Sequence, residues 1–146
     1  MTKSSLYVSP GGAGKRGFED LECYGLALQV MARVHQFSKS LPSEEKYDLF
    51  AQIRRSSKGA AANIAEGYGR YHFLDSLRFY SIARGELNET LAHLINARTL
   101  GYIDQPDFAS IYNLVRRTER TLNGYMAYVR RLRSGVGEYG DKAIGE

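Results

Sequence analysis

The sequence lacks the features that would mark a secreted, disulfide-bonded or membrane-spanning protein. Its 146 residues contain a single cysteine, Cys23, so no internal disulfide can form. A lone cysteine fits a reducing compartment, and we expect Cys23 to be a small buried apolar group rather than a nucleophile. There is no run of 18 apolar residues and no basic start followed by an apolar stretch, as a signal peptide would have. We therefore expect a soluble cytoplasmic protein without a membrane partner.

Proline is also scarce, and the chain between the prolines has a helical period. From residue 18 to residue 133 only Pro42 and Pro106 occur, both where helices are expected to end or begin. Apolar residues recur at steps of three and four in four long segments, and none shows the alternation of a strand. The first segment runs from Leu21 to the interruption SKSLPSEEK, and the third from about Phe73 to Leu100.

Three positions give predicted ends for these helices. Ser43 is a suitable N-cap for the second helix, with Glu44 and Glu45 in its first turn against the helix dipole. Gly101 is expected to end the third helix, and Pro106 suits the first turn of the fourth.

The fourth segment has the most regular apolar stripe. Its spacing alternates four and three without a break through Ile111, Val115, Thr118, Leu122, Tyr125, Val129 and Leu132. A 3.5-residue period of this length is typical of packing against nearly parallel helices. With short connections, the pattern predicts an all-α fold, an antiparallel up-and-down four-helix bundle over residues 18–133. Residues 1–17 and 134–146 are rich in Gly and Ser, and we expect them to be flexible tails.

The stretch SSKGAAANIAEGYGR, residues 56–70, raises the question of a phosphate-binding loop. A P-loop places its lysine after the second glycine and follows a strand, whereas Lys58 precedes its glycine within a helical pattern. Gly67 and Gly69 lack the third glycine of a dinucleotide fingerprint. We therefore expect a packing helix, whose small residues admit a close neighbour and whose two glycines end it in a left-handed conformation.

Catalytic and metal-binding patterns were not found in the sequence. A di-iron bundle needs Glu-x-x-His pairs, and Glu89 to His93 is one residue too wide. His35 and His72 have no matching partner, so the histidines are expected to be packed or surface side chains. No nucleophile stands in a recognisable constellation. We predict neither an enzyme activity nor a cofactor.

Charge is the remaining signal. The net charge is +4, and Lys58 is the only lysine between Arg54 and Arg133. Arginine suits phosphate because its planar guanidinium can donate two parallel hydrogen bonds. Two interpretations stay open, namely solvated helix faces or contacts to an anionic partner. The candidate contacts are Arg54, Arg55, Lys58, Arg70, Arg116, Arg117, Arg120, Arg130, Arg131 and Arg133.

Three stretches, FEDLECYGLAL, QIRRSSKGAAANIAEGYGR and FYSIARGELNETLAHLINARTLGYI, resemble one known family over residues 18–133. It is the four-helix-bundle family of proteins encoded in intervening sequences of bacterial large-subunit rRNA genes, which includes the accessory variability determinants of diversity-generating retroelements. The resemblance rests on QIRR (52–55), NIAEG (63–67) and ARG (83–85). The sequence departs from the family at Ala61, Tyr24 and Glu86, where Pro, Trp and Ser are usual.

The resemblance implies a homopentameric barrel with a basic surface and no catalytic activity of its own. It also implies binding of RNA or an RNA–DNA intermediate, and of a reverse transcriptase during mutagenic retrohoming. The alternative is an oligomeric protein–protein scaffold with no nucleic-acid role, in which the arginines pair with acidic faces of adjacent subunits.

Four residues of the resembling stretches, Asn63, Glu66, Gly67 and Arg84, are expected to have structural roles. The polar ones lie on largely apolar helices. An Arg84–Glu66 pair between adjacent helices would satisfy both charges and fix the helix register.

Overall fold

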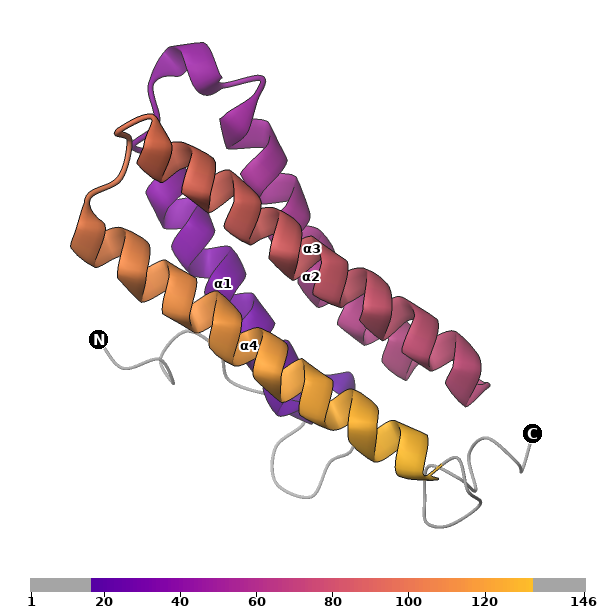
Figure 1. Cartoon of the computed structure of the whole chain (residues 1–146). Coiled ribbons are helices and arrows are strands. Elements are labelled where there is room, and N and C mark those ends of the chain that lie inside the picture. Colours follow the sequence, from indigo (N-terminus) through magenta and orange to yellow (C-terminus); the bar gives the residue numbers. More distant parts are fainter. Residues whose placement is uncertain (1–16, 133–146) are drawn as a thin grey trace.

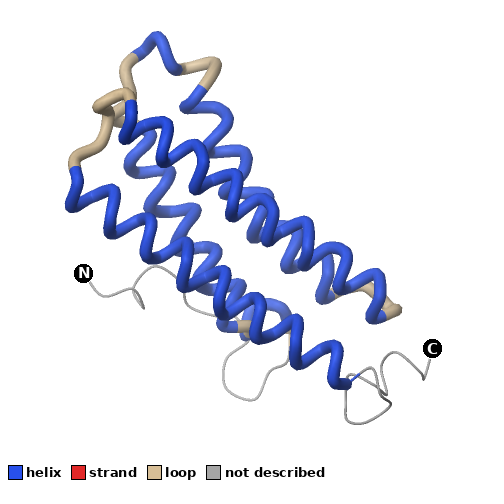
Figure 2. Tube along the Cα trace, in the orientation of Figure 1, coloured by secondary structure: helices blue, strands red, loops and turns tan. Residues whose placement is uncertain are grey.

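The computed structural model describes residues 17–132 of the chain (Figure 1). The two predicted tails, apart from residue 17, lie outside the described residues, and so does Arg133. Four long helices make up most of the described chain, and no strand occurs within residues 17–132 (Figure 2). The prediction of an all-α fold with four helices is therefore confirmed.

The helices follow the predicted segments closely. They are α1 (Glu22–Ser38), α2 (Leu49–Tyr68), α3 (Phe73–Thr99) and α4 (Gln105–Leu132). Short 3₁₀ helices, Phe18–Asp20 and Ser43–Glu45, precede α1 and α2. At about 1.5 Å per residue, the 28 residues of α4 span roughly 40 Å.

The helices pack in a cyclic order. α1 contacts α2 and α4, and α3 contacts the same two helices, with the most extensive contact between α2 and α3. The α1–α2 and α3–α4 connections lie at one end of the molecule, and the α2–α3 connection lies at the other (Figure 1). Helices α2 and α4 are therefore separated by the other two, so their outer surfaces are distinct.

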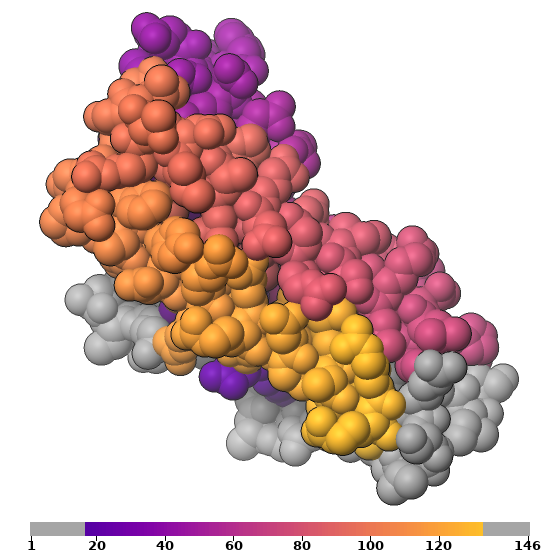
Figure 3. Space-filling model, viewed as in Figure 1, coloured from indigo at the N-terminus to yellow at the C-terminus, as the bar shows by residue number. Residues whose placement is uncertain are grey.

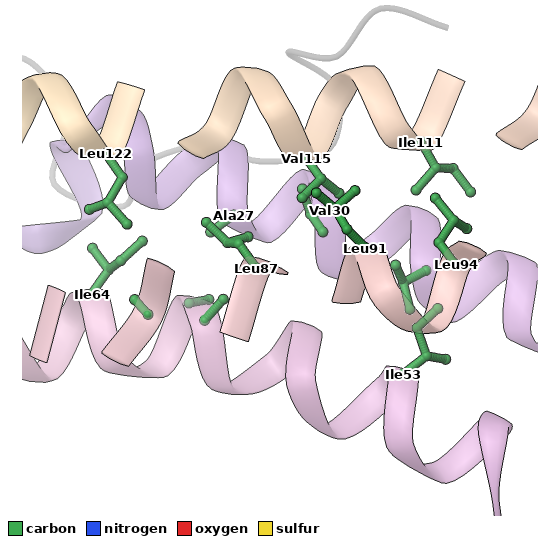
Figure 4. Close-up of a cluster of buried hydrophobic side chains, with 14 of the residues drawn as sticks. Ala27, Val30, Ile53, Ile64, Leu87, Leu91, Leu94, Ile111, Val115 and Leu122 are labelled. Carbon is green, nitrogen blue, oxygen red and sulfur yellow. The ribbon is translucent and has the colours of Figure 1, made fainter. Parts of the chain in front are cut away.

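One apolar core joins all four helices. Figure 4 shows side chains from each helix pointing toward one another, among them Val30, Ile64, Leu87 and Leu122. All four side chains are fully buried. Cys23 is also buried, and burial raises the pKa of its thiol to about 12. Cys23 is therefore a packed apolar group, as predicted. Its thiol stays protonated, and a protonated thiol is a poor nucleophile.

The predicted helix ends are right at α3 and α4 and wrong at α2. Gly101 follows α3 with a φ of 79°, the left-handed conformation expected of a glycine stop. Pro106 lies in the first turn of α4. Ser43, however, does not cap α2, because a 3₁₀ turn and a further turn delay the start of α2 until Leu49. Ser43 is instead the first residue of the 3₁₀ helix, which Pro42 precedes.

A side-chain cap exists instead at α4, which gives a stability prediction. The Asp104 carboxylate accepts a hydrogen bond of 3.0 Å from the backbone N–H of Asp107. We expect Asp104→Ala to lower the free energy of unfolding by about 1 kcal/mol, since an orphan N–H loses its partner. Ser43→Ala should change it by less than about 0.5 kcal/mol. Urea denaturation of both variants checks this, and equal losses would contradict the assignment.

The glycines of residues 67–69 do not act as predicted. Within residues 17–132 Gly101 is the only residue with a positive φ, so neither Gly67 nor Gly69 is left-handed. Gly67 lies inside α2, where a Cβ would come 2.6 Å from Cε1 of Tyr80 on α3. Its role is the close approach of α3, which is the packing part of the prediction. Gly69 follows α2 with an ordinary φ of −82°.

Candidate nucleic-acid interface

The outer surface of α4 carries five arginines, which we call the α4 basic face. Glu119 is the only acidic residue between positions 108 and 132. Because the core side chains of α4 recur at its 3.5-residue period, the positions between them turn away from the other helices. Figure 3 shows α4 at the surface beside α3. The members of the face are Arg116, Arg117, Arg120, Arg130 and Arg131.

One arginine of this face is engaged within the molecule. The Arg116 guanidinium donates to the Tyr112 hydroxyl at 3.2 Å and to Glu119 Oε1 at 2.8 Å. These hydrogen bonds, that of Tyr112 first, raise the pKa of Arg116. Glu119 is only 7% exposed, so its carboxylate pairs with Arg116 and is largely shielded from solvent.

The other members of the face have no acidic partner. In the part of the chain that the structure describes, Arg117, Arg120 and Arg130 form no hydrogen bond or ion pair. Arg120 and Arg130 are exposed, and Arg117 is half-buried. Arg131 lies over the Tyr128 ring, 5.9 Å from its centroid. The face therefore presents uncompensated positive charge to solvent.

The predicted residues of α2 do not form one surface, because neighbouring arginines diverge. Arg55 turns toward α3, where its guanidinium forms an ion pair with Glu89. Burial acts to raise the pKa of Glu89, but hydrogen bonds from His93 and Arg55 outweigh it, so the pKa is lowered. Arg55 is thus largely neutralised. Arg70 is similarly paired with Glu66 at 2.8 Å.

Arg54 turns the other way, toward α1. Its Nε donates to Ser38 Oγ at 2.8 Å, and its Nη2 lies 3.1 Å from Nε2 of His35. The guanidinium also stacks on the Phe50 ring, 4.2 Å from the centroid. Lys58, one turn along α2, is exposed. The structure brings this pair against His35 and Lys39 of the α1 end.

These four residues, His35, Lys39, Arg54 and Lys58, are here named the α1–α2 basic cluster. His35 and Lys39 were not predicted as interface residues. The signal that could have found them is the spacing, since each helix supplies two basic residues four apart. Burial first, and then the charges of Arg54, Lys39 and Lys58, lower the pKa of His35.

A comparison with protein families shows to which family this chain is related. A model of the family described as 23S rRNA-intervening sequence proteins matches residues 19–124. The chain belongs to this family. The resemblance recognised in residues 18–133 of the sequence is therefore confirmed.

A solved structure supports the family relationship. The chain is similar to the crystal structure of a protein of unknown function from the S23 ribosomal protein family of Bacteroides thetaiotaomicron. The two are 27% identical with a TM-score of 0.67, and the match covers 71% of this chain and 97% of the other. A comparison with curated proteins gave no match.

In this member of the intervening-sequence family, the ion pair that was predicted to fix the helix register does not form. The Arg84–Glu66 pair is wrong, because Glu66 pairs with Arg70 one turn away. Arg84 instead donates to Oδ1 of Asn123 on α4 at 3.0 Å. The partner of Arg84 depends on which side of α3 its side chain faces. Successive residues are rotated by about 100° around a helix, so the sequence alone did not determine that side.

Asn63 makes a polar contact between α2 and α3. Its amide donates to Glu86 Oε1 at 2.7 Å and to the Gly59 carbonyl at 3.0 Å. The Glu86 carboxylate occupies the space that a Cβ at Gly59 would fill. The family departure at Glu86 is thus accommodated by a glycine on the facing helix.

Neither a metal cluster nor a membrane span is found in the described chain. Residues 17–132 contain no group of three His, Cys, Asp or Glu side chains that could hold a metal ion. Glu89 and His93, whose spacing was considered for a metal site, contact each other: His93 Nε2 lies 3.2 Å from the Glu89 carboxylate, which also forms an ion pair with Arg55. Over the same residues, no helix combines the length and apolarity needed to cross a bilayer.

Proposed function

We propose that this protein is a non-enzymatic, oligomeric nucleic-acid-binding protein whose α4 basic face contacts the phosphates of RNA. The observation that carries the proposal is the unpaired arginine of α4, with Arg117, Arg120 and Arg130 free of any acidic partner in residues 17–132. A solvated helix face usually mixes both signs of charge, whereas this one does not.

The residue type favours phosphate over a generic acidic surface. All five basic residues of the face are arginines. Arginine binds phosphate through two parallel donors, and a row of such residues neutralises a backbone without reading its sequence.

The proposal includes self-association through α3. Between Arg78 and Arg98 every exposed residue of α3 is uncharged, and we call this set the α3 neutral face: Ser81, Ile82, Gly85, Asn88, Ala92, Ile95 and Asn96. Exposed helix faces normally carry charge. A Cβ at Gly85 would meet nothing within 4 Å, so no packing within the chain requires that glycine.

A second copy is the occupant that we propose for the α3 neutral face. Small residues there would let another helix approach closely, and the nearby α4 face remains free for RNA. By its family resemblance we propose that an antiparallel up-and-down bundle assembles into a homopentamer. We further propose that it acts in the cytoplasm as an accessory protein of a diversity-generating retroelement and binds a reverse transcriptase.

Light scattering across a salt series tests the proposal. After nucleic acid is stripped at high salt, we expect a particle of about five subunits that binds structured RNA with a steep salt dependence. A stable particle indifferent to RNA would instead support the protein scaffold. Salt-sensitive particle mass without RNA binding would place the arginines between subunits.

The α3 neutral face is tested separately with one matched pair of variants. Ala92→Glu puts a charge on this face and is expected to reduce the particle mass, because burying an unpaired carboxylate costs several kcal/mol. Ala62→Glu adds the same charge at an exposed position of α2 and should leave the mass unchanged. Equal masses for the two variants would place the interface elsewhere.

A further inference from the structure

The α1–α2 basic cluster brings four basic side chains from two helices together on one surface. His35 and Lys39 are four residues apart on and just past α1, and Arg54 and Lys58 are four residues apart on α2. Both spacings place the two groups on one side of their helix. Because Arg54 contacts His35 directly, the two pairs face one another across the α1–α2 contact.

No carboxylate balances this charge. In residues 17–132 no ion pair involves Lys39, Arg54 or Lys58, and every charge that acts on the His35 pKa is positive. Asp48, the acid nearest to Arg54 in sequence, forms no ion pair in the described chain, and Glu45 is bonded to Tyr102 and to the backbone of Leu49. Arg54 and Lys58 are like charges four residues apart on α2, a spacing that destabilises a helix.

Arg54 is held in a fixed position while part of its donor capacity is unused. Ser38 and His35 accept from two of its five N–H groups, and the Phe50 ring supports its plane. A guanidinium oriented in this way loses little freedom when it binds an anion. The exposed Lys58 ammonium and the exposed Lys39 ammonium add mobile charge at the rim.

We propose that the α1–α2 basic cluster binds a single phosphate group, with Arg54 as the fixed donor and Lys39, Lys58 and His35 around it. The inference rests on the proposed function, according to which the bound phosphate belongs to an RNA backbone. A free phosphate has the same chemistry. It adds a defined site, separate from the α4 basic face, on the α1–α2 surface.

His35 couples this site to pH. A guanidinium has no acceptor, so its bond to Nε2 requires a neutral His35 ring with that nitrogen unprotonated. In the free protein burial first, and then the charges of Arg54, Lys39 and Lys58, keep the His35 pKa below its ordinary value. A bound phosphate offsets those charges and favours the imidazolium, which no longer accepts from Arg54, so Ser38 and the Phe50 ring then hold the guanidinium. Binding therefore takes up a proton, and affinity rises as the pH falls through the raised His35 pKa of the bound state toward the lower pKa of the free protein.

The test follows the histidine ring by NMR on the full chain. Histidine-labelled protein is titrated with pH alone, with inorganic phosphate and with a short RNA, at matched ionic strength; His35→Gln assigns the signal among three histidines. We expect the His35 pKa to rise with either probe. Arg54→Gln should abolish the rise and weaken RNA binding about tenfold.

The neighbouring arginine supplies the control. Arg55→Gln removes the same charge one residue away, where the side chain is paired with Glu89, and should keep the pKa response. Should Arg54→Gln disturb folding, Lys58→Gln serves instead, because Lys58 is exposed and has no hydrogen bond in the described chain. An unchanged response in Arg54→Gln or Lys58→Gln would overturn the site.

The probes separate this inference from the proposed function. Tight RNA binding with an unmoved His35 signal would reject the site and leave the α4 basic face intact. A His35 response to inorganic phosphate without any RNA binding would keep the site and reject the nucleic-acid function. An unmoved His35 signal with both probes, together with no RNA binding, would reject both.

Discussion

Replacing Arg117 and Arg120 together by glutamine is expected to lower RNA affinity by roughly tenfold to a hundredfold near 0.1 M salt. Both arginines lack an acidic partner in the described chain, so their charge is available to phosphate. Each phosphate contact that is lost also removes about 0.7 to 0.9 from the slope of log K against log salt. The double variant should therefore reduce the slope by about 1.4 to 1.8.

The affinity and slope are best measured by fluorescence anisotropy of a labelled structured RNA over a salt series. A matched double variant, Lys46→Gln with Arg78→Gln, changes the net charge equally at exposed residues outside α4. It separates local contacts from the general effect of net charge. If both double variants lose the same affinity and slope, the α4 basic face is not the RNA contact.

The apolar period predicted the helices well, because it reports which side chains must leave water. The stripe of α4 from Ile111 to Val129 consists largely of residues that are fully buried in the structure. The α2 start was misplaced because Ser43 satisfies the local rule for an N-cap, whereas in the structure it is the first residue of a 3₁₀ helix and its side chain forms no hydrogen bond in the described chain. Local signals fix that a turn begins there, but tertiary packing decides how long it continues.

The site was only partly predictable for a related reason. Composition identified the arginines, but the partner of each depends on helix rotation and on which neighbour lies there. Arg54 and Arg55 are adjacent in sequence, yet one faces α1 and the other pairs with Glu89 of α3. His35 was predicted to be a packed or surface side chain because it has no metal-ligand partner in the sequence, and its contact with Arg54 spans 19 residues of sequence.

Gly67→Ala is expected to destabilise the protein by about 1 to 3 kcal/mol, although alanine is the better helix former. The added Cβ would lie 2.6 Å from Tyr80 Cε1 and 3.1 Å from Phe79 Cβ. Tyr80 is fully buried, so its ring has no room to move aside. Alanine's helix propensity returns about 1 kcal/mol, which the steric conflict must exceed.

The matched control is Gly124→Ala, also within a helix. A Cβ at Gly124 would meet nothing within 4 Å, so only propensity acts and the variant should gain about 0.5 to 1 kcal/mol. Urea denaturation at one protein concentration compares the two, since oligomer stability depends on concentration. Opposite signs are required. If Gly67→Ala is stabilising as well, α3 can move away from α2, and the close approach at Gly67 does not fix the packing of these two helices.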